Sequence, residues 1–187
     1  MNVPAHNEHR FTVKDYYRLA EIGVLKPDAR VELLEGQVID TPHVTPLHAG
    51  TLARLAQLFG HTAEKWLLVV RSEVVLNEYS QLQPDLMMVE PRSDYYSNRH
   101  PGPEDVYLLV EVSDTSLTTD REVKLPAYGR AGIPEVWIVN LLEQTIEVYR
   151  EPHFSGYATK TVLRTGETAQ PLAFSDVAID VGELLKR

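Results

Sequence analysis

The chain has 187 residues, of which 18 are basic and 27 acidic, giving a formal net charge of −9 and a pI near 5.2. Its 43% hydrophobic and 24% charged residues are typical of a globular protein, and its length predicts one domain over residues 1–187. The absence of cysteine excludes a disulfide scaffold, a thiolate zinc site and a cysteine nucleophile. The acidic balance counts against broad electrostatic adhesion to nucleic acid, because nonspecific binding of DNA depends mostly on lysine and arginine.

The sequence shows no candidate membrane segment. Its apolar stretches are about five to seven residues long, whereas a helix that spans a bilayer needs about 20. The start of the chain also lacks the apolar run of a signal or an anchor. We therefore expect a soluble, cytoplasmic protein.

The start of the chain predicts a helix followed by a hairpin. Thr12 and Asp15 have the spacing of a capping box at a helix start, and Gly23 is expected to end that helix. Residues 31–39 then contain two short apolar runs around Glu35 and Gly36, which is typical of two strands joined by a tight turn.

A second helix is expected next. Thr45 followed by Pro46 is typical of a helix start, because proline is favoured at the first helical position. One face of this helix carries an apolar stripe and also His48. The stripe consists of Leu52, Leu55 and Phe59.

Three strands should follow the second helix, at residues 66–76, 82–89 and 106–113. Each range is a run of mainly apolar residues, and a polar segment separates the last two. A further strand is expected at residues 135–141, with a partner at residues 146–150.

A helix is predicted over residues 119–132, between the third and fourth of these strands. Thr119 and Glu122 have the spacing of a capping box, and Gly132 is a stop signal. Pro126 conflicts with an unbroken helix because it lacks a backbone N–H. Either the helix kinks there, or a turn precedes a shorter helix that starts near Pro126.

The order helix, three strands, helix, strand predicts an α/β fold with a mixed sheet and helices on its faces, preceded by an N-terminal helix and hairpin. We expect residues 106–113 and 136–139 to lie parallel, joined by a right-handed crossover through the intervening helix.

Two carboxylates interrupt runs that otherwise have the pattern of buried strands. Strand alternation places Glu111 on the face of Tyr107 and Leu109. Asp85 opens another apolar run directly after Pro84, which is tolerable at a strand start. An uncompensated carboxylate is costly in a low-dielectric interior, so each of these acids needs a partner.

Two interpretations of this pair are open. In the first, Asp85 caps a turn and Glu111 forms a structural salt bridge with an arginine or lysine. In the second, the two acids converge from neighbouring strands to bind Mg²⁺ or Mn²⁺, which prefer carboxylate, carbonyl and water oxygens. Lys124 on the following helix is then the candidate for a basic group beside the metal.

The two acids lie 26 residues apart, and Pro84-Asp85 with Glu111-Val112-Ser113 resembles the PD-(D/E)xK nuclease signature. The order of the predicted elements matches the core of that restriction-endonuclease-like superfamily. More narrowly, an ordered set of segments resembles the Uma family of restriction endonucleases. These segments are residues 32–36, His48, residues 83–85, residues 110–113, residues 120–124 and residues 128–138.

The resemblance implies that Asp85 and Glu111 are catalytic metal ligands and that the backbone carbonyl of Val112 is a third ligand. The chain departs from the superfamily pattern at Ser113, where a lysine is usual. The family resemblance places the lysine role on Lys124 instead.

Other positions are candidates for the same site. Arg121, Lys124 and Tyr128 are three and four residues apart, so on a regular helix they face one way. Glu32 matches a family position and is a candidate extra ligand, or else a surface strand residue. His48 is a candidate contact to water or phosphate, or else a satisfied core histidine.

The resemblance implies a Mg²⁺- or Mn²⁺-dependent nuclease that hydrolyses phosphodiester bonds, with DNA as the expected substrate. One alternative is a noncatalytic nucleic-acid- or protein-binding module of the same fold, which Ser113 favours. Another is a metal-dependent phosphoesterase that acts on small nucleotides. A homodimer is expected, because two sites would allow double-strand cleavage.

Overall fold

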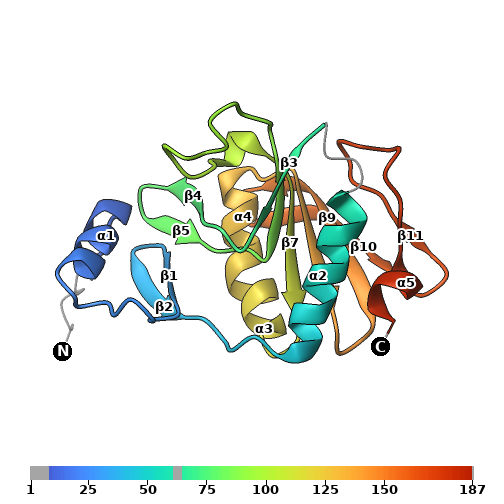
Figure 1. Ribbon diagram of the computed structural model, residues 1–187, viewed down its shortest axis with the longest axis horizontal. Coiled ribbons are helices and arrows are strands. Elements are labelled where there is room, and N and C mark those ends of the chain that lie inside the picture. Colours follow the sequence, from blue (N-terminus) through green and yellow to red (C-terminus); the bar gives the residue numbers. More distant parts are fainter. Residues whose placement is uncertain (1–8, 61–64, 187) are drawn as a thin grey trace, which may run out of the picture.

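A computed structural model describes residues 9–60 and 65–186, which fold into a mixed α/β structure (Figure 1). Its helical segments are α1 (Val13–Glu21), α2 (Pro46–Gly60), η1 (Pro103–Asp105), α3 (Leu117–Thr119), η2 (Asp120–Lys124), α4 (Leu125–Ala131) and α5 (Val181–Leu185). Its strands are β1 (Val31–Leu34), β2 (Gln37–Asp40), β3 (Leu67–Val70), β4 (Val74–Asn77), β5 (Ser80–Leu82), β6 (Leu86–Val89), β7 (Val106–Ser113), β8 (Glu135–Asn140), β9 (Thr145–His153), β10 (Gly156–Leu163), β11 (Thr168–Ala169) and β12 (Ile179–Asp180).

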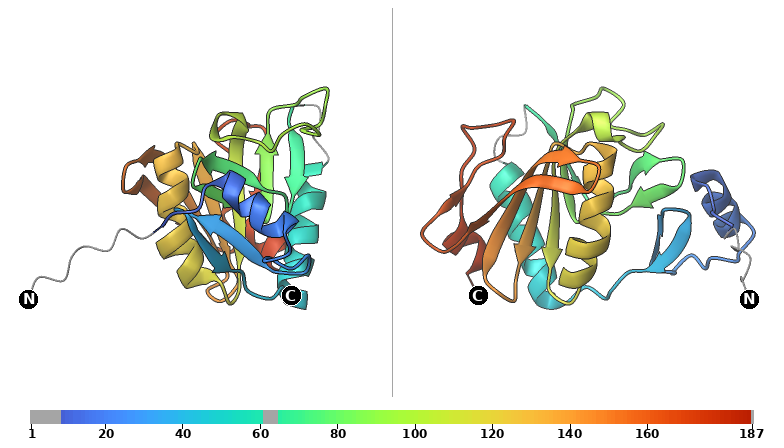
Figure 2. Two further views of the ribbon diagram at one scale, coloured as in Figure 1. Left: turned by 90° about the vertical axis from the view of Figure 1, so that its left-hand side faces the viewer. Right: turned by 180° about the vertical axis from the view of Figure 1, so that it is seen from behind.

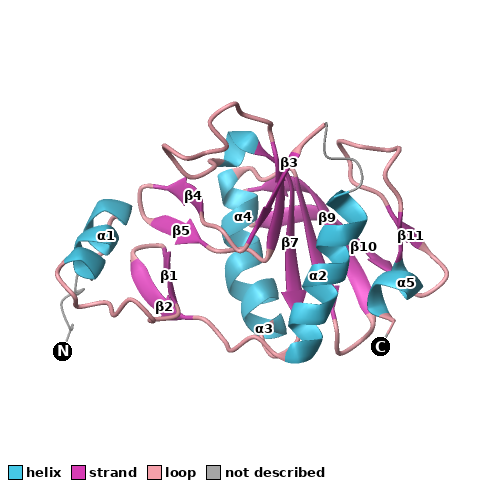
Figure 3. Cartoon of the chain, in the orientation of Figure 1, coloured by secondary structure: helices cyan, strands magenta, loops and turns pink. Residues whose placement is uncertain are grey.

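These strands form one large sheet, one small sheet and one isolated pair (Figure 3). The large sheet has the order β10-β9-β8-β7-β6-β3, and the small sheet has the order β2-β1-β5-β4. Strands β7 and β8 are parallel, with Glu111 opposite Ile138, and the chain between them passes through α3, η2 and α4. The predicted mixed sheet and the predicted parallel pair are therefore confirmed.

Apolar cores cover both faces of the large sheet, with α2 and α4 on opposite sides (Figure 2, left). The core on one side joins residues of α2 and α5, including Phe59 and Leu184, to Trp137 of β8. The core on the other side joins Tyr128 of α4 to Leu82 of the small sheet. The apolar stripe predicted on α2 is buried, as expected.

The local signals near the start of the chain have the predicted structures. Thr12 Oγ1 accepts the Asp15 N–H at 3.1 Å, and an Asp15 carboxylate oxygen accepts the Thr12 N–H at 2.9 Å. Gly23 follows α1 with φ +77°. Glu35 and Gly36 join β1 to β2, both with positive φ, which is the backbone of a tight hairpin turn.

Two predicted strands are each divided between the two sheets. The range 66–76 forms β3 in the large sheet and β4 in the small sheet. The chain changes direction between them at Arg71, which has φ +48°. The range 82–89 likewise divides into the end of β5 and β6, with Pro84 and Asp85 between them. The sequence prediction missed these breaks because apolar residues stand on both sides of each short polar stretch, at residues 71–73 and 83–85.

The helix after β7 begins earlier than predicted, at Leu117, and Thr119 makes no capping hydrogen bond. A π-turn, η2, precedes α4, and the Leu125 N–H bonds to the Asp120 carbonyl five residues back. This wider turn lies immediately before Pro126, the residue that cannot donate a backbone hydrogen bond. A regular α-helix therefore starts close to Pro126, and Gly132 ends it with φ +83°.

A β-bulge corrects the predicted face of Glu111. Val89 pairs with Val106 and Met88 pairs with Leu108, so Tyr107 is an extra residue in β7. Tyr107 packs on the α2 side of the sheet, whereas Leu109 packs on the α4 side. Glu111 thus shares the face of Leu109 but not that of Tyr107.

Within the described residues, no helix is long and apolar enough to cross a membrane.

Candidate active site

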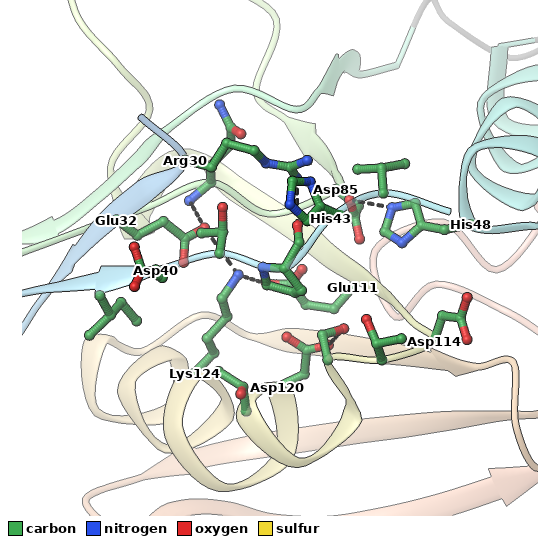
Figure 4. Close-up of a pocket in the computed structure, with 18 of the residues that line it drawn as sticks. Arg30, Glu32, Asp40, His43, His48, Asp85, Glu111, Asp114, Asp120 and Lys124 are labelled. Atoms are coloured by element: carbon green, nitrogen blue, oxygen red, sulfur yellow. Dashed lines mark hydrogen bonds and ion pairs between the residues drawn. The ribbon is translucent and has the colours of Figure 1, made fainter. Parts of the chain in front are cut away.

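Asp85 lies just before β6, and its carboxylate is fixed by two groups from other elements, of which Figure 4 shows His48. The Val112 N–H of β7 donates to Asp85 Oδ2 at 2.8 Å, and His48 Nε2 of α2 lies 2.8 Å from Asp85 Oδ1. The Arg71 N–H also donates to the Asp85 carbonyl at 2.9 Å. The side chain of Asp85 is therefore held in one orientation while it lines a pocket.

Glu111 lies toward the end of β7, beside the start of the antiparallel β6, so it is at the same end of the sheet as Asp85. It is 3% exposed. The Tyr128 hydroxyl donates to Glu111 Oε1 at 2.6 Å, and Lys124 Nζ donates to the same oxygen at 3.3 Å. Both donors come from the helical segment that connects β7 to β8.

Lys124 bridges two carboxylates that are far apart in the sequence. Its Nζ lies 3.1 Å from Glu32 Oε1 as well as 3.3 Å from Glu111 Oε1. Glu32 is on β1, and the same Oε1 accepts the Gln83 N–H at 3.0 Å. The other oxygen, Glu32 Oε2, is buried without a hydrogen-bond partner among the described residues. Glu32 is thus a buried residue that lines the pocket, and not the surface strand residue of the alternative interpretation.

Ser113 occupies the position where the superfamily pattern has lysine, and it does not face the pocket. Its hydroxyl donates to Asp120 Oδ2 at 2.7 Å, and the Ser116 hydroxyl donates to the same oxygen at 2.6 Å. Asp120 is buried and lines the pocket, one helical turn before Lys124. Ser113 therefore positions a fourth buried acid. We call Glu32, Asp85, Glu111 and Asp120 the acid cluster.

Arg121 does not share the face of Lys124 and Tyr128, contrary to the prediction. Its guanidinium pairs with Glu147 of β9, with Nε at 3.1 Å from Oε2, and it also approaches Glu143. The prediction assumed regular α-helical spacing, whereas Arg121 and Lys124 lie inside the π-turn η2, which changes the angle between successive side chains. Arg121 is therefore outside the acid cluster.

The charges in the cluster are unbalanced, because four buried acids share the pocket with one lysine. Burial raises the pKa of Glu111 well above its ordinary value, and the neighbouring acids raise it further against the opposing charge of Lys124. Burial also raises the pKa of Asp120. Burial alone would lower the pKa of Lys124, but the surrounding carboxylates outweigh it and raise that pKa. The lysine therefore stays charged in a site with an excess of acid.

Buried acids elsewhere in the described chain are compensated differently. Burial raises the pKa of Glu147, but its bonds to Arg121, Tyr149 and Lys160 outweigh burial and lower that pKa to about 2. Glu135 likewise pairs with an arginine, Arg150, at 2.7 Å. In a purely structural salt bridge, an arginine and other strong donors compensate the charge of one acid, as they do for Glu147 and Glu135. In the acid cluster one lysine is shared between Glu32 and Glu111, so the acids are less fully compensated, which favours the interpretation of a site that receives a cation.

The acid cluster lines a pocket that also receives side chains from several other segments (Figure 4). Asp40 and Asp114 add two more carboxylates, so we call it the acid pocket. Asp114 accepts a hydrogen bond from the Thr45 hydroxyl at 2.6 Å, which ties the start of α2 to the end of β7. Basic groups in the lining are Arg30, His43, His48, Arg71 and Lys124.

The donors of this pocket suit a hard divalent cation, although no three His, Asp or Glu side chains of the described residues form a preassembled metal site. All the acids offer oxygen ligands, as Mg²⁺ and Mn²⁺ prefer. The N–H of Val112 points to Asp85. In a strand, the N–H and C=O of one residue point to the same edge, so the Val112 carbonyl is directed to that side too. The unpartnered Glu32 oxygen adds a further candidate ligand.

Several pocket residues were not found from the sequence. Asp120 had a local signal, because it precedes Lys124 by four residues, about one turn of a helix. Asp114 directly follows the predicted strand that carries Glu111. Arg30, Asp40 and Arg71 had no local signal, since they reach the pocket only through the packing of the small sheet and of the segment after β3.

Comparisons with known proteins agree with this fold. The profile of the Uma2 family, described as "Putative restriction endonuclease", matches residues 13–182. Among solved structures, a crystal structure of a "putative nuclease belonging to DUF820" from Anabaena variabilis ATCC 29413 superposes with a TM-score of 0.69. It is 15% identical, and the match covers 94% of this chain and 97% of that one. No curated protein matches the chain. The predicted restriction-endonuclease-like fold is confirmed.

Proposed function

Because this chain belongs to the Uma2 family, we propose that it is a divalent-metal-dependent nuclease that hydrolyses phosphodiester bonds in DNA. The family description and the nuclease-like fold support a nuclease-type enzyme. The metal dependence and the DNA substrate are our inference from the pocket. One observation carries it: four buried acids from four segments line one pocket with a single lysine, which pairs with two of them.

The residues of the pocket divide into ligands and groups that orient them. Asp85, Glu111 and the Val112 carbonyl would hold Mg²⁺ or Mn²⁺, with Glu32 as a further ligand. When bound there, such an ion would supply Lewis-acid chemistry, polarising a phosphoryl group and lowering the pKa of a bound water. His48 and the Val112 N–H fix Asp85, while Tyr128 fixes Glu111. These donors keep the ligands oriented before substrate binds.

Lys124 has a separate role in this proposal. Its side chain is 9% exposed, and the raised pKa keeps its ammonium charged next to Glu32 and Glu111. A preorganised positive charge at this point stabilises the negative charge that develops on the phosphoryl oxygens in the transition state. The same group can donate a hydrogen bond that orients the attacking water. The chemistry needs no covalent intermediate on the protein.

A nicking assay tests the function. Purified protein with Mg²⁺ or Mn²⁺ should convert supercoiled plasmid to the open-circular form, and EDTA should abolish the conversion. Asp85→Asn keeps an oxygen acceptor for the Val112 N–H, so the variant should fold but lose the activity. Asp176→Asn removes a surface acid outside the pocket and should leave the rate unchanged. Full activity in Asp85→Asn or Lys124→Ala would overturn the assignment.

One observation favours the noncatalytic alternative. Lys124 already pairs with Glu32 and Glu111, which is a closed arrangement that a purely structural ion pair would also show. Titration calorimetry with Mn²⁺ separates the two functions. The nuclease proposal requires binding that both Asp85→Asn and Glu111→Gln abolish, whereas the noncatalytic module should bind no divalent ion at these residues.

A further inference from the structure

Two arginines in the lining of the acid pocket differ from most arginines of the described chain. Six others each form an ion pair with a carboxylate, namely Arg18, Arg92, Arg99, Arg121, Arg130 and Arg150. Arg30 and Arg71 line a pocket with six carboxylates, yet no ion pair joins either guanidinium to an acid among the described residues. The positive charges of Arg30 and Arg71 therefore have no carboxylate partner among the described residues, although the pocket that they line is rich in acids.

Hydrogen bonds hold both arginines at the pocket. Arg71 directly follows β3, and its N–H donates to the carbonyl of Asp85, the candidate metal ligand, at 2.9 Å. Its φ of +48° is unusual for a residue with a side chain and persists only where the surroundings enforce it. Arg30 lies just before β1, where its Nη2 donates to the Pro42 carbonyl at 2.6 Å. In Figure 4, Arg30 lies across the pocket from Lys124 and Asp120.

The charge of the chain makes such groups necessary for the proposed substrate. A polynucleotide carries one negative charge per phosphate, and the net charge of −9 and the acid pocket both repel it. Lys124 is already engaged by Glu32 and Glu111. A guanidinium presents a planar fork of N–H donors that matches phosphate oxygens in a bidentate contact. Arg30 and Arg71 are the groups in this pocket that can supply it.

We propose that Arg30 and Arg71 form a phosphate clamp that binds backbone phosphates of a polynucleotide next to the bond that is cut. This proposal rests on the proposed nuclease function. The clamp binds the phosphates that flank the reacting one, so its residues are positioning residues. Substrates with several phosphates should therefore depend on the clamp, and a minimal diester with one phosphate should depend on it less.

Binding to DNA tests the clamp independently of catalysis. The affinity for a fluorescein-labelled duplex oligonucleotide is measured by anisotropy in EDTA at several salt concentrations. Arg30→Gln and Arg71→Gln should each weaken binding about tenfold, the loss expected for one charge-assisted hydrogen bond. Each should also lower the slope of log K against log salt by about 1, as removal of one phosphate contact does. Arg30→Lys and Arg71→Lys should restore the slope.

Arg164→Gln is the matched control, because it removes one exposed arginine outside the pocket. It should leave both the affinity and the slope unchanged. An equal loss in Arg164→Gln would show that only net charge matters and would overturn the clamp. Wild-type protein that does not bind the duplex, or clamp variants with the wild-type slope, would overturn it too.

Kinetics separate the clamp from the nuclease assignment. With Mn²⁺, Arg30→Gln and Arg71→Gln should raise KM for duplex DNA about tenfold with little change in kcat, in line with the binding loss. Hydrolysis of bis(p-nitrophenyl) phosphate, a diester with a single phosphate, should fall less in both variants than cleavage of DNA at limiting substrate. If the wild type hydrolyses neither substrate, the nuclease proposal fails, and the salt slopes still decide the clamp. If the wild type cleaves DNA and the variants keep its KM, the clamp alone fails.

Discussion

Lys124 Nζ lies 3.3 Å from Glu111 Oε1, although Lys124 follows Glu111 by thirteen positions in the chain. The superfamily pattern would place a lysine at Ser113, two positions after Glu111 on the same strand. Here Ser113 instead bonds Asp120, and the helical segment after β7 brings an ammonium to the same carboxylate. The folded chain therefore brings a lysine to Glu111 although the sequence has no lysine two positions after it.

The lysine should stabilise the acid cluster whether or not the protein is catalytic. Lys124→Met leaves Glu32 and Glu111 buried without their counter-charge, so we expect a loss of about 3 kcal/mol in the free energy of unfolding in EDTA. Mg²⁺ should recover part of that loss, because a bound cation replaces the missing charge. Urea unfolding with and without Mg²⁺ measures both effects. Lys14→Met, on the exposed side of α1, is the control, and an equally stable Lys124→Met would contradict the expectation.

Tyr128 should act through Glu111. Tyr128→Phe removes the 2.6 Å hydrogen bond while it keeps the buried ring, so we expect a loss of about 1 kcal/mol in stability. If Glu111 is a metal ligand, the variant should also bind Mn²⁺ more weakly by calorimetry. Tyr157→Phe removes the hydroxyl that donates to the Ile133 carbonyl outside the pocket. It should cost similar stability without a change in Mn²⁺ affinity.

Glu147 should make stability depend on acid pH. Its pKa is lowered to about 2 from an ordinary value of 4.5, so the folded state favours the charged form. The resulting contribution, about 3 kcal/mol, is present above pH 4.5 and is lost as the pH falls from about 4.5 to about 2. Unfolding at pH 6 and at pH 3 should therefore differ less in Glu147→Gln than in the wild type. Identical pH dependence in both proteins would contradict the ion-pair network around Glu147.

Two substitutions of Arg71 separate the effect of its backbone strain from the effect of its charge. Arg71→Gly and Arg71→Ala both remove the guanidinium, but only glycine adopts a φ of +48° without steric cost. Arg71→Gly should therefore be more stable than Arg71→Ala by about 1 kcal/mol in thermal or urea unfolding. Both should lose DNA affinity to the same extent if Arg71 contacts phosphate. Equal stability of the two variants would show that the left-handed backbone stores no strain.

Local features of the fold were predictable because neighbouring residues determine them. The Thr12–Asp15 capping box, the hairpin at Glu35 and Gly36, and the helix end at Gly132 depend on contacts within a few residues. The breaks within the ranges 66–76 and 82–89 were missed, because a buried strand has the same apolar pattern in either sheet.

The sequence by itself determined the candidate acids Asp85 and Glu111, because a carboxylate in an apolar run is costly enough to require an explanation. Their convergence with Glu32 and Lys124 was decided only by tertiary structure, which pairs β6 with β7 and packs the small sheet against α4. The same applies to the exclusion of Arg121, which follows from a π-turn that residue spacing does not reveal. Chemistry that depends on residue type was readable along the chain. Which side chains meet depends on backbone geometry and long-range packing, and the linear order of residues does not contain these.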